Sequence, residues 1–251
     1  MQEDGIFHHE ALRTLVRAKQ SSRSWFTTAR DLCLQYGLPH PIELLQTNQS
    51  KEQVRNLMKK AVLSYWEQKL RDEAEPLLSL EYFKPQFMSL TSPHPILTTA
   101  GSNPYQTAMS TVQALMLSGR YRTELLCSKW SPQSSGSCLT PTCKGLDIPE
   151  DLQHILVSCG SLGETRNSLR AFTDKQSAKN PEIKPLIDKY CSPQHPDFPQ
   201  FLIDCSVLPD VIQANQGSPI NILIPLFKIT RTWCYCLHWA RLRVLGRWRK
   251  F

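Results

Sequence analysis

The segment from Cys138 to Cys159 constrains the fold more than any other part of this 251-residue chain. It holds four side chains that bind soft metals, Cys138, Cys143, His154 and Cys159, with four, ten and four residues between successive members. A structural zinc site takes four nitrogen or sulfur donors in a tetrahedron, usually as two pairs close in sequence. The spacing therefore predicts one bound Zn²⁺ with these four residues as ligands.

The residues around the ligands favour a turn followed by a short helix. Pro141 and Gly145 are turn formers beside the first ligand pair. The segment PEDLQHILVSC predicts a helix with Pro149 at its first position and two acidic residues in its first turn. Such a helix carries His154 on one face and brings Cys159 in at its C-terminal end. The alternative is three reduced thiols and a surface histidine with no metal.

Positive charge is concentrated at the end of the chain. Residues 211–251 contain seven Lys and Arg and no Asp or Glu, which equals the net charge of +7 of the whole protein. Such asymmetry indicates a polyanionic partner, and we expect non-specific binding to nucleic acid. A basic-aromatic cluster around Tyr121 is a second candidate contact, or it pairs with a neighbouring acid. The candidate nucleic-acid contacts are Arg120, Arg122, Arg241, Arg243, Arg247, Arg249 and Lys250.

The last element is expected to be a helix over 221–248 with a kink at Pro225. On an unbroken helix, Arg243, Arg247 and Lys250 share one face, so the helix presents cations while its other side packs. Trp239 and Trp248 can stack on unpaired bases, but we expect them to anchor the helix to the core.

The nine cysteines are odd in number and accompany no secretion signal, so we expect them to be reduced or metal-bound. No apolar run reaches the length of a membrane span. These features predict an intracellular protein of the nucleus or cytoplasm that is neither secreted nor transmembrane.

Hydrophobic periodicity predicts helices almost throughout. The clearest runs from Ser50 to Ala74, with a capping box at Ser50 and Gln53 and an apolar stripe from Val54 to Tyr65 that we expect to be buried. Asn103 is expected to cap another helix. No alternating strand pattern is present. We therefore predict a mainly α fold, an irregular helical domain with a small zinc-knuckle segment and a basic C-terminal helix.

Three regions follow from these patterns. They are a helical region at 1–130, a zinc-knuckle segment at 131–173 and a helical C-terminal region with the basic tail at 174–251. The polar stretch at 174–184 is a candidate hinge or linker between the last two.

Several segments resemble one family when they are taken in order. They are SRSWFTTARDLCLQYGLPHP, LSYWEQKLRDEA, PHPILTTAGSNPYQTAMSTVQALMLSGRYRTELLCSKW, the Cys/His knuckle and the tail TRTWCYCLHWARLRVLGRWR. They look like the C-terminal part of the polyprotein of non-LTR (LINE-type) retrotransposons, after the reverse transcriptase core. The resemblance covers nearly all of the chain from Ser22 onward.

The resemblance implies that the chain holds template RNA or target DNA during target-primed reverse transcription, together with other parts of such a polyprotein. It also assigns the metal-ligand role to the four residues of the knuckle. The paired aspartates of a polymerase and the acids and histidine of the endonuclease have no counterpart in this sequence. We therefore expect this chain not to be an enzyme.

Two other functions are compatible with these patterns. In the first, the chain is a helical protein–protein interaction module in which zinc only stabilises the fold. The basic tail is then a localisation signal or docks on an acidic protein. In the second, it is a hydrolase with a Cys/His pair. The second is disfavoured because no cysteine has an activating neighbourhood and the best Cys/His grouping has metal-ligand spacing.

Overall fold

The computed structural model describes residues 25–47, 49–77, 80–87 and 90–247. Over these ranges the protein is mainly helical and contains no β-strand, which confirms the predicted fold class. The chain divides into two compact units, Met1–Asp72 and Glu73–Phe251, and the boundaries expected at 130/131 and 173/174 do not coincide with this division. No helix within the described ranges combines the length and apolar character needed to cross a bilayer.

Unit 1 is built from α2 (Trp25–Gln35), α3 (Pro41–Gln46) and most of α4 (Lys51–Ala74). The predicted capping box begins α4. The Ser50 amide donates to Gln53 Oε1 at 2.8 Å, and the Gln53 amide donates to Ser50 Oγ at 3.3 Å. These two bonds satisfy donors that otherwise have no partner at a helix start.

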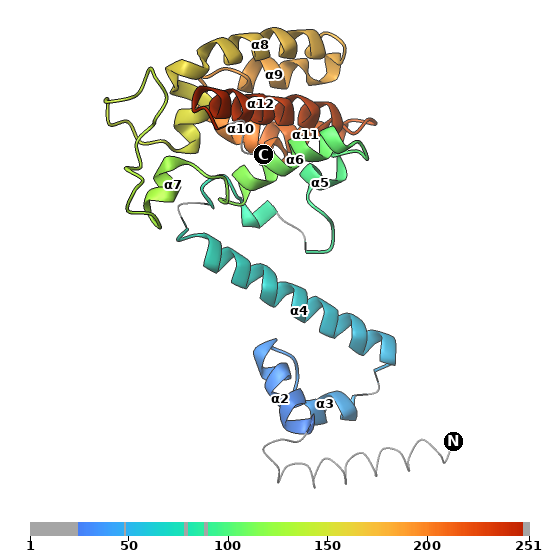
Figure 1. The fold of residues 1–251 in the computed structure, drawn as a ribbon. Coiled ribbons are helices and arrows are strands. Elements are labelled where there is room, and N and C mark those ends of the chain that lie inside the picture. Colours follow the sequence, from blue (N-terminus) through green and yellow to red (C-terminus); the bar gives the residue numbers. More distant parts are fainter. Residues whose placement is uncertain (1–24, 48, 78–79, 88–89, 248–251) are drawn as a thin grey trace. The chain divides into compact units, whose positions relative to one another are not determined.

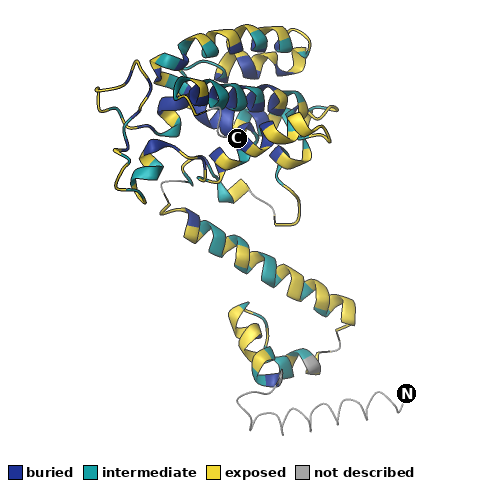
Figure 2. Cartoon of the chain, in the orientation of Figure 1, coloured by how far each residue is buried: buried dark blue, intermediate teal, exposed yellow. Residues whose placement is uncertain are grey.

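The apolar stripe of α4 is not buried as expected. Ala74 is the only residue of α4 that is fully buried, Met58 is 45% exposed, and Leu57 and Ala61 are half-buried. The Tyr65 ring meets the Tyr36 ring edge-on at 5.0 Å between centroids. The short helix α2 therefore covers only part of the stripe, and the prediction of a buried face was wrong (Figure 2).

Unit 2 is organised around α12 (Leu223–Val244), which contacts α6 (Pro104–Leu117), α8 (Gly163–Ser177) and α10 (Phe198–Ile203). Figure 1 shows α12 in the middle of this unit, between α8 and α6. Trp233 of α12 is fully buried, and its Nε1 donates to Thr173 Oγ1 of α8 at 2.8 Å. A buried indole with a satisfied N–H is a strong anchor for a helical core.

Shorter helices complete unit 2. Asn103 caps α6 as predicted, since its Oδ1 accepts from the Tyr105 amide at 2.8 Å. The remaining helices of this unit are α5 (Pro95–Thr98), α7 (Glu124–Ser128), α9 (Lys184–Tyr190) and α11 (Pro209–Gly217).

The last helix is shorter and straighter than expected. Pro225 lies in the first turn of α12, where its missing N–H removes no intrahelical bond, so it causes no kink. The helix ends at Val244, and Gly246 follows with φ of 65°, the left-handed conformation common just after helices. Arg247 therefore lies outside the helix and does not continue the face of Arg243.

The polar stretch at 174–184 is not a linker. Helix α8 continues to Ser177, and a 3-10 turn at Pro181–Ile183 leads into α9. Ile183 is 0% exposed and belongs to the same hydrophobic cluster as Trp233. The buried side chain of Ile183 therefore anchors this polar stretch to the core.

The packing of Ile183 is testable by substitution. We expect Ile183→Ala to lower the free energy of unfolding by about 2–5 kcal/mol, because it removes buried methyl groups and leaves a cavity. The matched control is Ile224→Ala, because Ile224 is 55% exposed. It is expected to change stability by at most about 0.5 kcal/mol. Urea denaturation followed by circular dichroism measures both, and equal midpoints for the two variants would contradict the packing of this stretch.

Candidate metal centre

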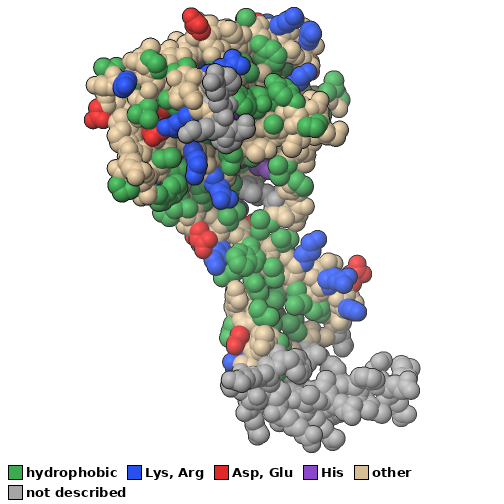
Figure 3. Space-filling model, in the orientation of Figure 1, with side chains coloured by type: hydrophobic (Ala, Val, Ile, Leu, Met, Phe, Trp, Pro, Cys, Tyr) green, Lys and Arg blue, Asp and Glu red, His purple; other side chains and the backbone are tan. Residues whose placement is uncertain are grey.

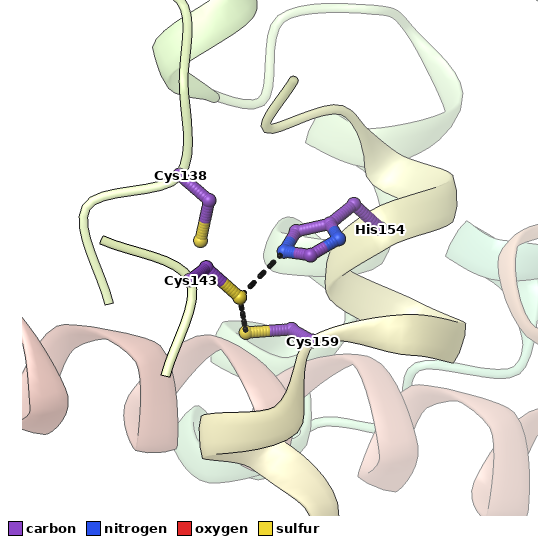
Figure 4. Close-up of side chains that lie close together, drawn as sticks. All are labelled: Cys138, Cys143, His154 and Cys159. Carbon is purple, nitrogen blue, oxygen red and sulfur yellow. Dashed lines mark hydrogen bonds between the residues drawn. The ribbon is translucent and has the colours of Figure 1, made fainter. Parts of the chain in front are cut away.

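The four predicted ligands come together in unit 2. Cys138, Cys143, His154 and Cys159 are all buried, and their donor atoms lie within 4.8 Å of one another. Cys143 Sγ lies 3.5 Å from His154 Nε2 and 4.0 Å from Cys159 Sγ. Figure 4 shows the four side chains pointing toward a common centre, two from the loop and two from the helical segment. The cluster can hold a metal ion.

The first ligand pair is placed by a turn that the sequence predicted. The Cys143 amide donates to the Thr140 carbonyl at 3.0 Å, which puts Pro141 at the second position of a β-turn. Gly145 follows with φ of 86°, a conformation that glycine adopts without steric cost. The turn directs the Cys143 thiol back toward the Cys138 thiol.

Thr140 is a site residue that the sequence analysis missed. Its hydroxyl lies 3.2 Å from Cys138 Sγ and 3.3 Å from Cys159 Sγ, and the residue is 1% exposed. The hydroxyl thus bridges one thiol of each ligand pair. The only sequence signal for this role was its position two residues after a ligand cysteine, inside the turn.

The second ligand pair spans a π-helical turn at His154–Ser158, which His154 begins and Cys159 follows as the C-cap. The Cys159 amide donates to the His154 carbonyl at 2.8 Å, which is an i→i+5 bond. In an α-helix, residues five apart are rotated by about 140° from each other. The wider turn reduces this rotation, so that both side chains face the same centre.

The start of this helical segment differs from the expectation. Pro149 lies in an isolated antiparallel bridge with Ser137, and the Cys138 amide donates to the Ile148 carbonyl at 2.8 Å. The His154 amide donates to Asp151 Oδ1 at 2.6 Å. This bond stabilises the first turn of the helical segment, which does not begin at Pro149 as predicted. The bridge closes the loop that carries the first two ligands.

The orientation of His154 suits a ligand. Its Nε2 faces Cys143, while its Nδ1 lies 3.0 Å from Ser158 Oγ. Metal-bound histidines commonly use the second ring nitrogen for such a bond, which holds the ring in place. Burial lowers the pKa of His154, which favours the neutral imidazole that ligates metals.

The thiols differ in their ease of ionisation. Burial raises the pKa of Cys138 to about 12. Burial also opposes ionisation of Cys143, but hydrogen bonds from Thr140, Thr142 and the Gly160 amide outweigh it and lower the pKa of this thiol. The Arg166 guanidinium donates to the Cys159 carbonyl at 2.6 Å, which places the positive charge of this side chain next to a ligand cysteine.

A buried ion pair adjoins the metal loop. Glu150 Oε1 pairs with the Arg241 guanidinium, with side-chain exposures of 0% and 5%. The same oxygen accepts from the Glu124 amide at 2.9 Å, and Arg241 lies 5.7 Å from the centre of the Tyr121 ring. Arg241 is therefore an internal partner of Glu150, and its prediction as a nucleic-acid contact was wrong.

The other predicted contacts have different surroundings. Arg120, Arg122 and Arg243 are exposed. Arg247 is also exposed, and it pairs with Glu124 Oε1 at 2.9 Å. Arg249 and Lys250 lie outside the described residues, as does Trp248.

Comparisons with known protein families, with curated proteins and with solved structures give no match to this chain.

The metal assignment predicts a stoichiometry of one metal ion per chain. Cys143→Ser is expected to lose the ion and loosen residues 137–159, because metal-binding energy at such a site is also local folding energy. Cys127→Ser is the matched control, since Cys127 is not a member of the cluster. Metal content by mass spectrometry and circular dichroism measure the outcome. Full metal content in Cys143→Ser would refute the assignment.

The buried ion pair predicts a large effect of removing one partner. Arg241→Met is expected to lower the free energy of unfolding by about 3–5 kcal/mol, because it leaves the Glu150 carboxylate buried without its counter-charge. Arg243→Met, at an exposed position two residues away, is expected to change it by at most about 0.5 kcal/mol.

Adding Glu150→Gln to Arg241→Met separates the charge effect from packing. The double variant is expected to recover part of the lost stability, because the uncompensated charge is gone. Urea denaturation measures all three variants. No recovery in the double variant would show that Arg241 acts through packing rather than through charge.

Proposed function

We propose that this chain is a zinc-binding, nucleic-acid-binding and non-catalytic module derived from the C-terminal part of a LINE-type retrotransposon polyprotein. The observation that carries the proposal is the buried Cys138/Cys143/His154/Cys159 cluster, which stands at the positions that the resemblance assigns to metal ligands. The ordered family-like segments and the surplus of positive charge support the nucleic-acid role.

The donor set and the two donor distances below are compatible with zinc. In a tetrahedron with Zn–S bonds of about 2.3 Å and a Zn–N bond of about 2.05 Å, adjacent donors lie about 3.8 Å (S to S) and about 3.5 Å (S to N) apart. Cys143 Sγ lies 4.0 Å from Cys159 Sγ and 3.5 Å from His154 Nε2. Four buried protein donors fill a tetrahedron and leave no position for substrate. This favours a structural rather than a catalytic ion.

The exposed arginines lie on two adjoining segments. Tyr121 is buried against α12, where its hydroxyl lies 3.0 Å from His238 Nδ1. Its sequence neighbours Arg120 and Arg122 are exposed, and so is Arg243 in the last turn of α12, two residues after the Arg241 that contacts the Tyr121 ring. We call Arg120, Arg122 and Arg243 the arginine surface. Figure 3 shows Lys and Arg side chains exposed on the visible face of unit 2.

Substitution of the arginine surface tests nucleic-acid binding. We expect the triple variant Arg120→Gln/Arg122→Gln/Arg243→Gln to bind single-stranded RNA or DNA at least tenfold more weakly at low salt. This corresponds to about 1.4 kcal/mol. Each lost phosphate contact is expected to reduce the steepness of log K against log salt by about 0.7. Fluorescence anisotropy over a salt series measures both quantities.

The matched control removes the same charge from unit 1. Lys51→Gln/Lys59→Gln/Lys60→Gln alters three exposed lysines of α4 and is expected to leave affinity and salt slope nearly unchanged. Equal losses in the two triple variants would show that net charge alone drives binding. Truncation of the C-terminal region is unsuitable as a test, because removal of α12 deletes the buried Trp233 and Leu237.

A protein–protein interaction module remains the second candidate, because α4 exposes apolar surface. Met58 and Trp66 of this helix are 45% and 42% exposed. In a retrotransposon polyprotein, such a face would pack against other parts of the same polyprotein. The absence of any salt-dependent nucleic-acid binding by the wild type would favour this candidate.

A further inference from the structure

An aromatic row runs over the surface of unit 2 from α6 onto α12. Tyr105 of α6 meets Tyr235 of α12 with ring centroids 5.3 Å apart and planes at 84°. Tyr235 in turn meets Trp239 at 6.1 Å and 71°. Trp239 also contacts the ring of His238 at 5.9 Å, and His238 contacts Tyr121 between the exposed arginines.

The row is partly open to solvent, most of all at Tyr105. Tyr105 is 56% exposed, and Tyr235 and Trp239 are half-buried, unlike Trp233 at 0%. Tyr235, Trp239 and Arg243 follow one another at four-residue steps, so they share a face of α12. Trp239 was expected to anchor the helix to the core, and this role explains only the buried side of its ring. In each pair the edge of one ring lies against a face of the other, so no two rings are stacked face to face and only the solvent-exposed parts of the rings are available to a ligand.

We propose that Tyr105, Tyr235 and Trp239 form a stacking surface for the unpaired bases of single-stranded nucleic acid, with the arginine surface holding the adjoining phosphates. This inference rests on the proposed function and specifies its substrate class. Bases of any sequence stack on aromatic rings, while cations follow the backbone, and this combination is typical of proteins that bind single strands.

The dimensions and chemistry of the row fit a short single strand. The rise from Tyr235 to Arg243 along α12 is about 12 Å, the length of about three stacked nucleotides. A duplex offers no free base faces, because its bases already stack inside the helix. It therefore gains nothing from the rings and is held only by phosphate contacts. The row thus predicts discrimination between single and double strands that arginines alone do not give.

The test compares aromatic variants on three ligands, two single strands and one duplex. Tyr105→Leu and Trp239→Leu are assayed by fluorescence anisotropy against labelled 12-nucleotide oligo(U), oligo(dT) and a 12-base-pair RNA duplex over a salt series. Each variant is expected to bind the single strands about 5- to 150-fold more weakly, the range for loss of one stacked base. The salt slope should stay unchanged, because no phosphate contact is lost. Duplex binding should also stay unchanged.

The matched control is Trp130→Leu, since Trp130 is 74% exposed and lies outside the row. It is expected to bind like the wild type. Circular dichroism and metal content check that each variant is folded. Tyr105 is more than half exposed, so its variant keeps the test valid if Trp239→Leu unfolds.

The outcomes separate this inference from the proposed function. Wild-type affinity in both aromatic variants, with weakened binding in the arginine variant, would overturn the stacking surface alone. Equal losses on duplex and single strand would overturn it as well. Loss of self-association in Tyr105→Leu, seen by light scattering with RNA affinity unchanged, would mark the row as a protein interface. No nucleic-acid binding by the wild type would overturn the proposed function and this inference together.

Discussion

The arrangement of unit 2 depends on the buried ion pair between Glu150 and Arg241. One carboxylate oxygen of Glu150 accepts hydrogen bonds from both the Arg241 guanidinium and the Glu124 amide. Three parts of the chain therefore meet at a single atom, namely the metal loop, α7 and the C-terminal part of α12. Separation of the metal loop from α12 would leave a buried charge without its counter-charge, which costs several kcal/mol. The pair thus fixes geometry more than it adds net stability.

The metal cluster and the ion pair support each other. Glu150 Oε2 and Arg241 Nε have no hydrogen-bond partner among the described residues, so the pair is incompletely satisfied. Such a pair persists only where the backbone around it is held firmly. Glu150 lies between Cys143 and His154 in sequence, so a metal ion held by both would restrain the backbone on either side of it. Because Tyr121 packs on Arg241, this restraint extends to the segment that carries Arg120 and Arg122.

Local patterns predicted the local features well. The ligand cluster, the capping box at Ser50, the Asn103 cap and the mainly helical fold all follow from short-range chemistry, namely donor spacing, side-chain caps and apolar periodicity. The failures concern contacts distant in sequence. Nothing near Pro149 signals a bridge to Ser137, and nothing in α4 shows how little of its stripe is covered. The π-turn at His154 brings His154 and Cys159 to one side, and the local sequence carries no propensity signal for it.

Arg241 shows why a count of charges misjudges a surface. Residues 211–251 carry seven cations, yet Arg231 and Arg241 are 2% and 4% exposed. The helical periodicity of this segment indicates that Arg241 is buried, because it follows Trp233 and Leu237 at four-residue steps on the buried face of α12. Arg241 has an acidic partner inside the protein, because Glu150 supplies a carboxylate from 91 residues away. Arg231 instead donates to the Phe227 carbonyl and to the Thr99 hydroxyl. A phosphate-binding surface must therefore be built from the cations of the opposite face, among which Arg243 follows Tyr235 and Trp239.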